Sequence, residues 1–537
     1  MKTAIVIFTI NACKRGLWNE VLDAVARQTF QPDERLVVDS NSQDKTVPIA
    51  IEHGWKTTII RREDFNHGLT RTQILRNLQA DGFDSVVFLS QDAILTSPDS
   101  LGTIMGFLHD NPVAGCFGRQ IDTRRHSLGA WQKKCYYPEV SRIKTLADIP
   151  HLKLMTPFFS NAFAAWKIAE ALEHGGFPCT MFGEDMLLAA KIIETGGAIG
   201  YCADAMVIHE HQESVYSLFQ RGRTVGDFHR LHPELLHRFG PPLRPPLDAN
   251  LPFIALRLLA KTLGYAWGRF RVQLTPWLIF ALLWLFLLPA ITLFDFMDPD
   301  VTNRYAPMAE SFAAGDWQHA FHPRIPPMLP VCAGIIAWLF SCGGYLACRL
   351  TGALFLTCGI FPLYWGTKHV YGFRVATVAT LMYAGCTRLF RLGYYGMRES
   401  ICVFGVLLLY QAAVRLRMRS AGWWWYLVFA AGEATLLLTR GDMASFALAT
   451  MAMLLFWDIL RHHHPLRTLG VTLALLVMML PALGYNYRMI GYPVTDVRQA
   501  TILRRICRQF PVLKMLENPH PQVSLDIDVP TAEANDE

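Results

Sequence analysis

Acidic side chains follow separate apolar stretches in the first half of the chain. Asp39 and Asp92 each end a strand-like run, and Glu184 and Asp185 open an apolar helical pattern. A carboxylate at a strand tip can accept hydrogen bonds from a base or a ribose, and a divalent cation that bridges phosphates needs only one or two protein carboxylates. A carboxylate can also deprotonate a hydroxyl as a general base. The alternatives are a helix cap at Asp39 and acids that complement a helix dipole at Glu184 and Asp185.

Two histidines further along the same half have the spacing of a binding site. His209 and His211 are two residues apart, so they share one face of an extended strand. Imidazoles in this arrangement can bind a metal or a phosphate. The alternative is a pair of polar side chains that are satisfied by hydrogen bonds within the protein.

Short apolar runs alternate with longer segments of helical periodicity from Met1 to about His237. This alternation predicts a doubly wound α/β domain, which binds ligands at the carboxyl ends of its strands. The predicted strands are Ala4–Thr9, Arg35–Val38, Thr57–Ile60 and Ser85–Leu89, and the predicted helices are Gly16–Gln28, Thr46–His53 and Thr70–Gln79.

In order and spacing, the acidic motifs resemble those of family 2 glycosyltransferases, which have a GT-A fold of the Rossmann-like, nucleotide-sugar-binding kind. Further motifs between Lys2 and His229 resemble the rhamnosyltransferase branch of that family. They are Phe65–Gly68 with Arg71, Gln91–Ala93, Gly118–Gln120, Phe159–Asn161, Gly175–Phe177 and His209–His211. The resemblance implies an inverting transfer of a sugar from a nucleotide donor, dTDP-rhamnose or a UDP-sugar, with Mg²⁺ or Mn²⁺ as cofactor.

The resemblance also implies roles for individual residues. Asp185, with Glu184 beside it, would be the catalytic base, and Asp92 would hold the metal. The residues that would contact the nucleotide sugar are Asp39, Ser40, Asn66, His67, Arg71, Gln91, Asn161 and His211. The sequence departs from the family's Asp-x-Asp, because Gln91 and Ala93 flank a single acid.

Composition assigns part of the chain to a membrane. Of 537 residues, 52% are hydrophobic and only 18% are charged, which favours a membrane protein over a wholly soluble one. The net charge of +6 is too mild for a nucleic-acid footprint, so no nucleic-acid partner is predicted. The 12 cysteines form no Cys-x-x-Cys pair, which predicts reduced thiols. The N-terminus lacks the features of a signal peptide, which predicts a cytoplasmic first half.

Apolar stretches of the length needed to cross a bilayer fill the second half. The predicted domains are a glycosyltransferase domain over 1–238, a Pro-rich linker and juxtamembrane amphipathic helix over 239–272, a membrane domain over 273–490, and a polar tail over 491–537. The predicted spans are Pro276–Phe294, Tyr345–Gly366, Val375–Phe390, Ile401–Val414, Trp424–Thr439, Met443–Leu460 and Gly470–Tyr485. For the amphipathic helix, the alternative is a helix packed on the first domain.

Basic loops decide the predicted orientation in the membrane. Lys368–Arg374, Arg415–Arg419 and Arg461–Arg467 would share one side with the N-terminal domain. The positive-inside rule makes this the cytoplasmic side of an inner membrane, with seven spans and an external C-terminus.

The predicted outer loop 295–344 resembles the first outer loop of GT-C transferases, the protein O-mannosyltransferase and aminoarabinose transferase kind. Those enzymes use polyprenyl-phosphate sugars and an outer-loop acid. Asp298, Asp300, Arg304 and Tyr305 follow the first span, and Asp298 or Asp300 would be that acid. Elsewhere in this half, the pair Arg398–Glu399 stands at a membrane boundary, where ion pairing or phosphate contact is expected.

Together these features predict a membrane-bound inverting glycosyltransferase that moves rhamnose or a similar hexose to a lipid-linked or cell-surface glycan. Two alternatives are left open. In one, the chain is bifunctional, and its first half makes a polyprenyl-phosphate sugar that the GT-C-like half uses on the outer face. In the other, the membrane region is a non-catalytic transporter or scaffold.

Overall fold

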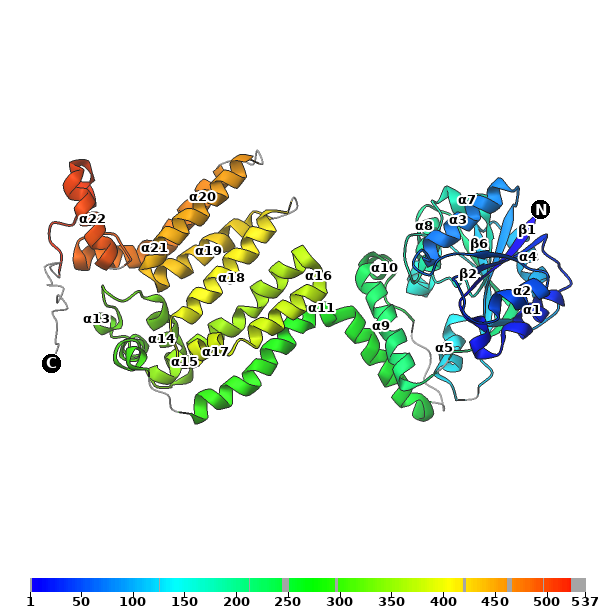
Figure 1. The fold of residues 1–537 in the computed structure, drawn as a ribbon, viewed down its shortest axis with the longest axis horizontal. Helices are drawn as coiled ribbons and strands as arrows, with labels where there is room; N and C mark the ends of the chain where they lie inside the picture. Colours follow the sequence, from blue (N-terminus) through cyan, green and yellow to red (C-terminus); the bar gives the residue numbers. More distant parts are fainter. Residues whose placement is uncertain are drawn as a thin grey trace. The chain divides into compact units, whose positions relative to one another are not determined.

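The computed structural model describes residues 2–124, 126–211, 213–243, 251–294, 298–418, 422–460, 466–495 and 497–522. The chain divides into two compact units, Met1–Arg271 and Val272–Glu537. The first unit combines a sheet with helices, and the second is built from helices (Figure 1). The predicted fold class, an α/β domain followed by an all-α domain, is confirmed.

Nine strands among the described residues of the first unit form one mixed sheet, in the order β3-β2-β1-β4-β8-β6-β9-β5, with β7 also paired to β9. β1 runs parallel to both β2 and β4, so these three strands end at the same edge of the sheet. The strands are β1 (Thr3–Thr9), β2 (Glu34–Asp39), β3 (Lys56–Ile59), β4 (Ser85–Ser90), β5 (Ala93–Leu95), β6 (Gly115–Ile121), β7 (Arg142–Lys144), β8 (Phe163–Lys167) and β9 (Ile199–His209).

Helices cover both faces of the sheet, because each buries an apolar side against it. One core contains apolar residues of α1 (Trp18–Ala26), α2 (Thr46–Glu52) and α4 (Ser100–Asp110). The core on the other face contains residues of α3 (His67–Ala80), α7 (Ile168–Glu173) and α8 (Glu184–Glu194). Shorter elements are η1 (Ala12–Arg15), α5 (Leu128–Tyr136), η2 (Leu146–Asp148), α6 (Ile149–Leu152) and η3 (Lys153–Met155).

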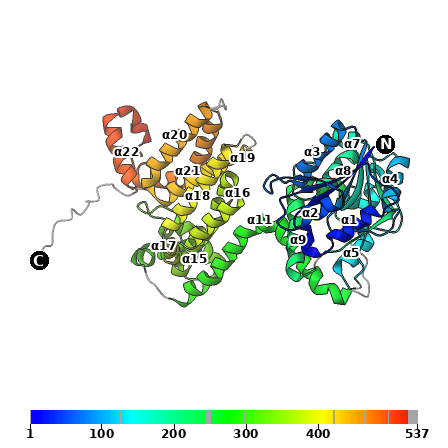
Figure 2. The ribbon, with the colours of Figure 1, turned by 45° about the vertical axis from the view of Figure 1, so that its right-hand side comes forward.

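The first unit ends in α9 (Val215–Leu231), α10 (Pro233–Phe239) and the beginning of α11 (Leu251–Leu293). α9 and the first part of α11 lie side by side (Figures 1 and 2). A Cβ atom at Gly222 would lie 2.0 Å from the Lys261 carbonyl oxygen, and one at Gly264 would lie 2.1 Å from that of Phe219. Glycines therefore allow the two backbones to touch.

One side of the predicted juxtamembrane helix therefore packs on α9. Another side carries large apolar residues that are exposed in the structure, among them Leu256, Leu259, Leu263, Trp267 and Phe270. Their spacing of three or four residues aligns them along one helix face. This face is available to a partner such as the bilayer interface.

The second unit consists of helices over its described residues. Those long and apolar enough to cross a membrane are Ile254–Leu293, Gly344–Ala384, Glu399–Leu416, Gly441–Leu460 and Thr468–Ile490, the first of which begins in the first unit. Two shorter apolar helices are Met328–Phe340 and Trp424–Thr439. The elements are η4 (Val301–Tyr305), α12 (Ala306–Ala313), α13 (Trp317–Ala320), α14 (Met328–Phe340), α15 (Gly344–Cys358), α16 (Ile360–Ala384), α17 (Thr387–Tyr394), α18 (Glu399–Leu416), α19 (Trp424–Thr439), η5 (Gly441–Met443), α20 (Ala444–Leu460), α21 (Leu466–Ile490), α22 (Val497–Gln509) and η6 (Pro511–Leu516).

The stretch Gly344–Ala384 reverses its direction at Gly372. This residue has φ 82° and ψ 177°, a conformation that is essentially restricted to glycine. Beyond the reversal, the Tyr383 hydroxyl donates to the Leu356 carbonyl at 2.8 Å. The apolar segments predicted on either side of Lys368–Arg374 are therefore two limbs of a helical hairpin.

Two segments that the sequence predicted as an outer loop and a polar tail contain helices. The region predicted as an outer loop, 295–344, is largely helical, since it contains η4, α12, α13 and α14. The predicted tail begins with α22, whose Cys507 packs in a small core with Ile490 and Tyr492. Residues 244–250 of the linker, 461–465 of the third basic loop and 523–537 of the tail lie outside the described residues.

Candidate functional site

The candidate site lies at the carboxyl ends of β1, β2 and β4. Asp39, the last residue of β2, is fully buried. Its carboxylate accepts hydrogen bonds from the Thr9 hydroxyl at 2.7 Å, the Ser42 backbone N–H at 2.7 Å and the Ser42 hydroxyl at 2.6 Å. The neighbouring Ser40 is also buried and donates its N–H to the Thr9 carbonyl at 2.9 Å. Three hydrogen bonds use most of the about four acceptor positions of a carboxylate, so Asp39 fixes the loop after β2.

Asp92 forms a cluster with His209 and His211. β5 and β9 pair with Ala93 opposite His209, which brings these segments together. One Asp92 oxygen lies 3.2 Å from His209 Nε2, and the other pairs with Arg15. The two imidazole rings are 4.3 Å apart. One ligand atom from each member of the cluster lies within 4.8 Å of the others, which is close enough for a shared metal ion.

A second contact orients His209, whereas one ring nitrogen of His211 has no hydrogen-bond partner among the described residues. His209 Nδ1 lies 2.9 Å from the Gln120 side-chain oxygen, and the Gln120 amide donates to the Ser160 hydroxyl at 2.8 Å. Since an amide oxygen only accepts, His209 Nδ1 donates to Gln120, and the ring is held with Nε2 toward Asp92. His211 Nδ1 is buried and makes no hydrogen bond to any residue that the structure describes. An imidazole nitrogen with no partner is what a metal ligand requires.

The protonation states also suit a divalent cation. Burial opposes ionisation of Asp92, but the hydrogen bond and charge of His209, together with Arg15, outweigh burial and hold the pKa of Asp92 at about 2. Burial, with the charges of His209 and Arg221, lowers the pKa of His211 to about 3. At neutral pH the cluster therefore offers an ionised carboxylate and a neutral His211 imidazole, the forms that bind metals.

A second cluster is built on the first turn of α8. Gly183 precedes this helix with φ 73°, and a Cβ there would lie 2.6 Å from the Phe228 ring. Glycine suits this position because it adopts a positive φ without strain and has no side chain that would clash with the Phe228 ring. This sharp entry turns Glu184 and Asp185 toward the segment that ends in Asn161.

Glu184 and Asp185 have different partners. Glu184 is buried and pairs with Arg71 Nη1 at 3.2 Å, and the Asn161 side-chain amide donates to it at 3.3 Å. Asp185 accepts from the backbone N–H groups of Asn161 at 2.9 Å and Met186 at 2.8 Å. Since Ser160 contacts Gln120, a short chain of contacts joins this carboxylate pair to the Asp92 cluster.

Asp185 has an unusual acidity. Burial raises its pKa to about 7, and the negative charge of Glu184 acts in the same direction, against the two backbone hydrogen bonds and the more distant Arg71. A carboxyl group with a pKa near the working pH is well suited to accept a proton in catalysis.

Arg71 lies between this pair and the strand ends. Its guanidinium stands over the Phe8 ring at 4.6 Å and the Phe88 ring at 5.4 Å. Nη1 also lies 3.1 Å from His67 Nδ1. Burial, and next the positive charge of Arg71, lower the pKa of His67. Arg71 Nε is buried without a hydrogen bond to the described residues.

Three residues predicted to contact the nucleotide sugar use their side chains to hold loops. Asn66 caps α3, because its side-chain oxygen accepts the N–H groups of Gly68 and Leu69. Gln91 contacts the Ile10 backbone, accepting its N–H at 2.9 Å and donating to its carbonyl at 3.4 Å. Asn161 accepts the Trp166 indole N–H at 2.9 Å. These amides help to position the loops of the site.

The candidates that follow the first span do not form one cluster. Asp298 accepts the backbone N–H groups of Asp300 at 3.0 Å and Val301 at 3.3 Å, so it caps the start of η4. Asp300 and Arg304 form a solvent-exposed pair at 3.2 Å. Such exposed pairs contribute little to stability.

Tyr305, Arg398 and Glu399 lie close together in the second unit. Tyr305 is buried, which raises its pKa, and the charge of nearby Arg398 opposes this shift. Glu399 Oε1 lies 3.7 Å from Arg398 and 3.3 Å from Arg440, which also binds Asp442 at 2.7 Å. Glu399 Oε2 is buried without a hydrogen bond to the described residues.

An apolar cavity of about 490 Å³ also lies in the second unit. Its wall includes residues of α14, α19 and α21 and two polar side chains, His322 and Asn486. The other lining residues are Phe312, Phe321, Ile325, Pro327, Met328, Val331, Leu438, Met478, Pro481, Ala482 and Tyr485.

The sequence prediction gave no role to Arg15 or Gln120, although both contact the Asp92 cluster. Gln120 stands in the motif Gly118–Gln120, so its presence was visible but its partner was not. Arg15 lies in η1 and reaches Asp92 across 77 positions of sequence. No periodicity signals such a contact.

Comparison with known proteins identifies the family. The model of Glycosyl transferase family 2 matches residues 4–169. The O-antigen chain rhamnosyltransferase RfbN of Salmonella typhimurium is 38% identical over 244 residues, which are 45% of this chain and 76% of that protein. The O-antigen chain rhamnosyltransferase WbaN of Salmonella anatum is 38% identical over 227 residues, 42% of this chain and 71% of that protein.

Among solved structures, the mannosyltransferase PcManGT from Pyrobaculum calidifontis is 18% identical and covers 63% of this chain and 87% of its own, with a TM-score of 0.34. The two curated relatives, matched over most of their own lengths, confirm the prediction from the sequence motifs. The chain therefore belongs to glycosyltransferase family 2, and its first unit is a GT-A glycosyltransferase domain.

Proposed function

We propose that this glycosyltransferase moves a sugar from a nucleotide-diphosphate donor to a lipid-linked or cell-surface glycan, with inversion at the transferred carbon. dTDP-rhamnose is the first candidate donor, because both curated relatives are rhamnosyltransferases by name; a UDP-sugar is the second. The observation that supports this function best is the connection of two clusters at one sheet edge. The Asp92 cluster and the Glu184–Asp185 pair are joined through Gln120 and Ser160.

In this proposal Asp185 takes the proton of the acceptor hydroxyl. Its pKa of about 7 leaves it ionised in a large fraction of molecules at neutral pH and makes it a stronger base than an ordinary carboxylate. Glu184, which pairs with Arg71, keeps a negative charge beside Asp185 and so supports this basicity. Asp39, at the end of β2, would contact the base or ribose of the donor.

Asp92, His209 and His211 would hold a Mg²⁺ or Mn²⁺ ion. A bound cation supplies positive charge against the departing diphosphate. Two imidazoles among three ligands favour Mn²⁺, since Mg²⁺ prefers oxygen ligands in regular octahedral geometry. Arg71 and Arg15 add cationic charge around the same edge of the sheet.

The second unit would anchor the enzyme in the inner membrane, with the first unit on the cytoplasmic side. Its apolar helices support the membrane location, and the basic loops that contain Lys368 and Arg415 support the orientation. An acceptor that is itself attached to a lipid would then be held at the same surface as the enzyme.

A donor screen on the full-length enzyme in nanodiscs tests the function. The enzyme is given dTDP-, UDP- and GDP-sugars with Mn²⁺ and a bacterial lipid-linked glycan extract, and products are identified by mass spectrometry. The expected result is one added deoxyhexose from dTDP-rhamnose and release of dTDP. If no donor is consumed faster than by the Asp185→Asn enzyme, the proposed function is wrong.

The cavity of about 490 Å³ favours one second candidate, the bifunctional chain. Its mostly apolar wall suits the tail of a lipid such as a polyprenyl phosphate. In that case the first product would be a polyprenyl-phosphate sugar, and the glycan would receive its sugar in a second step. Addition of pure polyprenyl phosphate to the donor screen separates the two functions, because only the bifunctional enzyme consumes it.

A further inference from the structure

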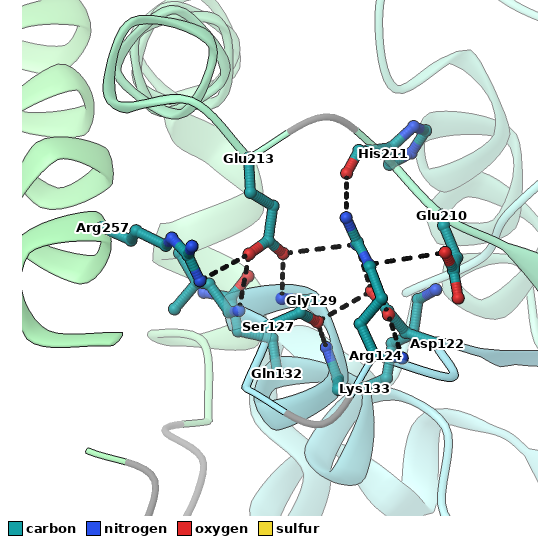
Figure 3. A network of polar contacts seen from close by, with 12 residues as sticks. Asp122, Arg124, Ser127, Gly129, Gln132, Lys133, Glu210, His211, Glu213 and Arg257 are labelled. Carbon is teal, nitrogen blue, oxygen red and sulfur yellow. Dashed lines mark hydrogen bonds and ion pairs between the residues drawn. The ribbon is translucent and has the colours of Figure 1, made fainter. Parts of the chain in front are cut away.

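A polar network surrounds Arg124, close to the Asp92 cluster but outside it. It joins the end of β6, the N-terminal part of α5 and the segment that follows β9 (Figure 3). In the figure, Arg124 points between Asp122, Glu210 and Glu213, and Arg257 approaches from α11. None of these side chains has a role in the proposed transfer reaction.

Arg124 binds the main chain of a proposed metal ligand. Its Nη1 donates to the His211 carbonyl at 2.8 Å. The guanidinium also forms a two-pronged contact with Asp122, with Nε at 2.9 Å and Nη2 at 2.6 Å from the two carboxylate oxygens. Asp122 is almost completely buried, with a side chain 1% exposed. A planar guanidinium with a buried carboxylate partner is held in one orientation.

Glu213 connects the same segment to α5. Its side chain is 8% exposed, and it accepts the N–H groups of Leu128 at 2.9 Å and Gly129 at 2.6 Å. These are the first N–H groups of α5, which have no partner within the helix. Arg124 Nη2 also lies 3.6 Å from Glu213.

Lys133 of α5 holds the other histidine of the cluster. Its ammonium donates to the His209 carbonyl and, at 3.1 Å, to the Ile121 carbonyl. The main chains at His209 and His211 are thus both bound by cations of one short region, residues 122–133. His211 lies beyond the last residue of β9, so no sheet ladder fixes it.

The network extends to α11. Arg257 lies 3.7 Å from Glu213 and donates to the His126 carbonyl at 2.8 Å, and Lys261 donates to the side chain of Gln132. α11 is the helix that continues into the first apolar span. The region between residues 122 and 133 is therefore bound by the metal-ligand segment on one side and by this helix on the other.

We propose that Arg124 and Glu213 are positioning residues for the metal site. Arg124 holds the main chain of His211, and Glu213 holds the start of α5, whose Lys133 binds the main chain of His209. Through Arg257 the same network ties this geometry to α11. The inference rests on the proposed metal site. Outer contacts that orient metal ligands change affinity by about 10- to 100-fold in general. Orientation through the main chain matters for His211, because its Nδ1 makes no hydrogen bond to the described residues and its ring is contacted at the edge by His209.

Mn²⁺ binding to the full-length enzyme in detergent tests the inference without a reaction. The concentration of free Mn²⁺ is measured by electron paramagnetic resonance during a titration. The expected increase in dissociation constant is about 10- to 100-fold for Arg124→Ala, and smaller for Glu213→Gln and Arg257→Ala. Arg124→Lys keeps the cation and can reach one acceptor, so it is expected to recover part of the affinity.

Asp227→Asn is the matched control. Asp227 of α9 pairs with Arg230 at 2.9 Å and with Arg271 of α11 at 2.7 Å, so the variant also breaks an ion pair between α9 and α11. Among the residues that the structure describes, Asp227 contacts none of the metal-ligand segment, so unchanged Mn²⁺ affinity is expected. A fall equal to that of Glu213→Gln would show a general loosening of α11 and would overturn the specific role.

The outcomes distinguish the positioning role of Arg124 and Glu213 from the metal site itself. If the wild type binds Mn²⁺ and Arg124→Ala and Glu213→Gln bind it equally well, the positioning role is wrong and the metal site stands. If the wild type binds no Mn²⁺, both fall. Circular dichroism melting identifies unfolding; should Arg124→Ala not fold, Glu213→Gln and Arg124→Lys decide. The Mn²⁺ concentration for half-maximal sugar transfer is expected to rise in parallel with the dissociation constant.

Discussion

Asp92 and Asp185 are two carboxylates at one edge of a sheet, and their surroundings shift their pKa values in opposite directions. Asp92 faces His209 and Arg15, and its pKa is about 2. Asp185 is buried beside Glu184, and its pKa is about 7. One group is therefore ionised under all physiological conditions, whereas the other exchanges a proton near neutrality. Neighbours, and not residue type, therefore suit Asp92 to its proposed role as a metal ligand and Asp185 to its proposed role as a base.

Replacing Asp185, the proposed base, is expected to have the largest effect. Asp185→Asn keeps the size of the side chain and can still accept one backbone N–H, but it cannot take a proton. A general base contributes about 10²- to 10⁴-fold, so the transfer rate is expected to fall by roughly 1,000-fold, measured as release of nucleotide diphosphate. Nucleotide and Mn²⁺ binding are expected to persist, and a rate within tenfold of the wild type would contradict the role.

Replacing Asp92, the proposed metal ligand, is expected to have the next largest effect. Asp92→Asn removes the ionised oxygen while leaving Asp185 unchanged. The dissociation constant for Mn²⁺ is expected to rise by more than about 100-fold, since loss of an outer contact alone costs about 10- to 100-fold. Isothermal titration calorimetry measures it. Unchanged affinity in this variant would remove the distinction between the two carboxylates.

The sequence motifs located both carboxylates but not the causes of their difference. Asp92 and the Glu184–Asp185 pair stand in recognisable motifs after strand-like runs, and β1 and β4 lie within one residue of their predicted bounds. Helix α3 begins at His67 rather than at Thr70, because Asn66 caps it. The amides of Asn66, Gln91 and Asn161, predicted to contact a ligand, also hold loops, which the sequence did not indicate.

Long-range contacts explain what sequence reasoning missed. Arg124 and His211 are 87 positions apart, and Glu213 meets the start of α5 from 85 positions away. Neither contact follows from local periodicity. The glycines Gly222 and Gly226 of α9, and Gly264 and Gly268 of α11, are an exception. Their spacing of four residues was readable as a close helix contact.

Replacing Glu184, the neighbour of Asp185, should reduce the difference in pKa between Asp92 and Asp185. Glu184→Gln removes the negative charge that raises the pKa of Asp185, and it frees Arg71 to lower that pKa further. The acidic limb of the pH–rate profile is therefore expected to move to lower pH. Glu173→Gln, at an exposed acid of α7, is the control and should leave the profile in place. Identical profiles for both variants would show that Glu184 does not tune Asp185.

The smallest effects are expected in the melting temperatures of Asp185→Asn and Asp92→Asn, which should shift in opposite directions. Folding raises the pKa of Asp185, so the stability that it supports is complete below about pH 4 and is lost as pH rises through about 7. Asp185→Asn is expected to melt about 2–4 °C higher than the wild type at pH 8, and by less at pH 5. Differential scanning fluorimetry without divalent cations measures this difference.

Replacing Asp92 is expected to shift the melting temperature in the opposite direction. Folding lowers the pKa of Asp92, so its contribution is complete above about pH 4 and is lost only as pH falls through about 2. Asp92→Asn is therefore expected to melt below the wild type at pH 8. Shifts of the same sign in both variants would contradict the contrast between the two sites.

The pH dependence of single-turnover transfer by the wild type, at saturating Mn²⁺ and donor, tests the role of Asp185 most directly. The rate is expected to increase tenfold per pH unit on the acidic side, to reach its midpoint near pH 7 and to become constant above it, because only ionised Asp185 accepts the acceptor's proton. A rate that is constant from pH 5 to pH 9, or one that falls as pH rises through 7, would contradict it.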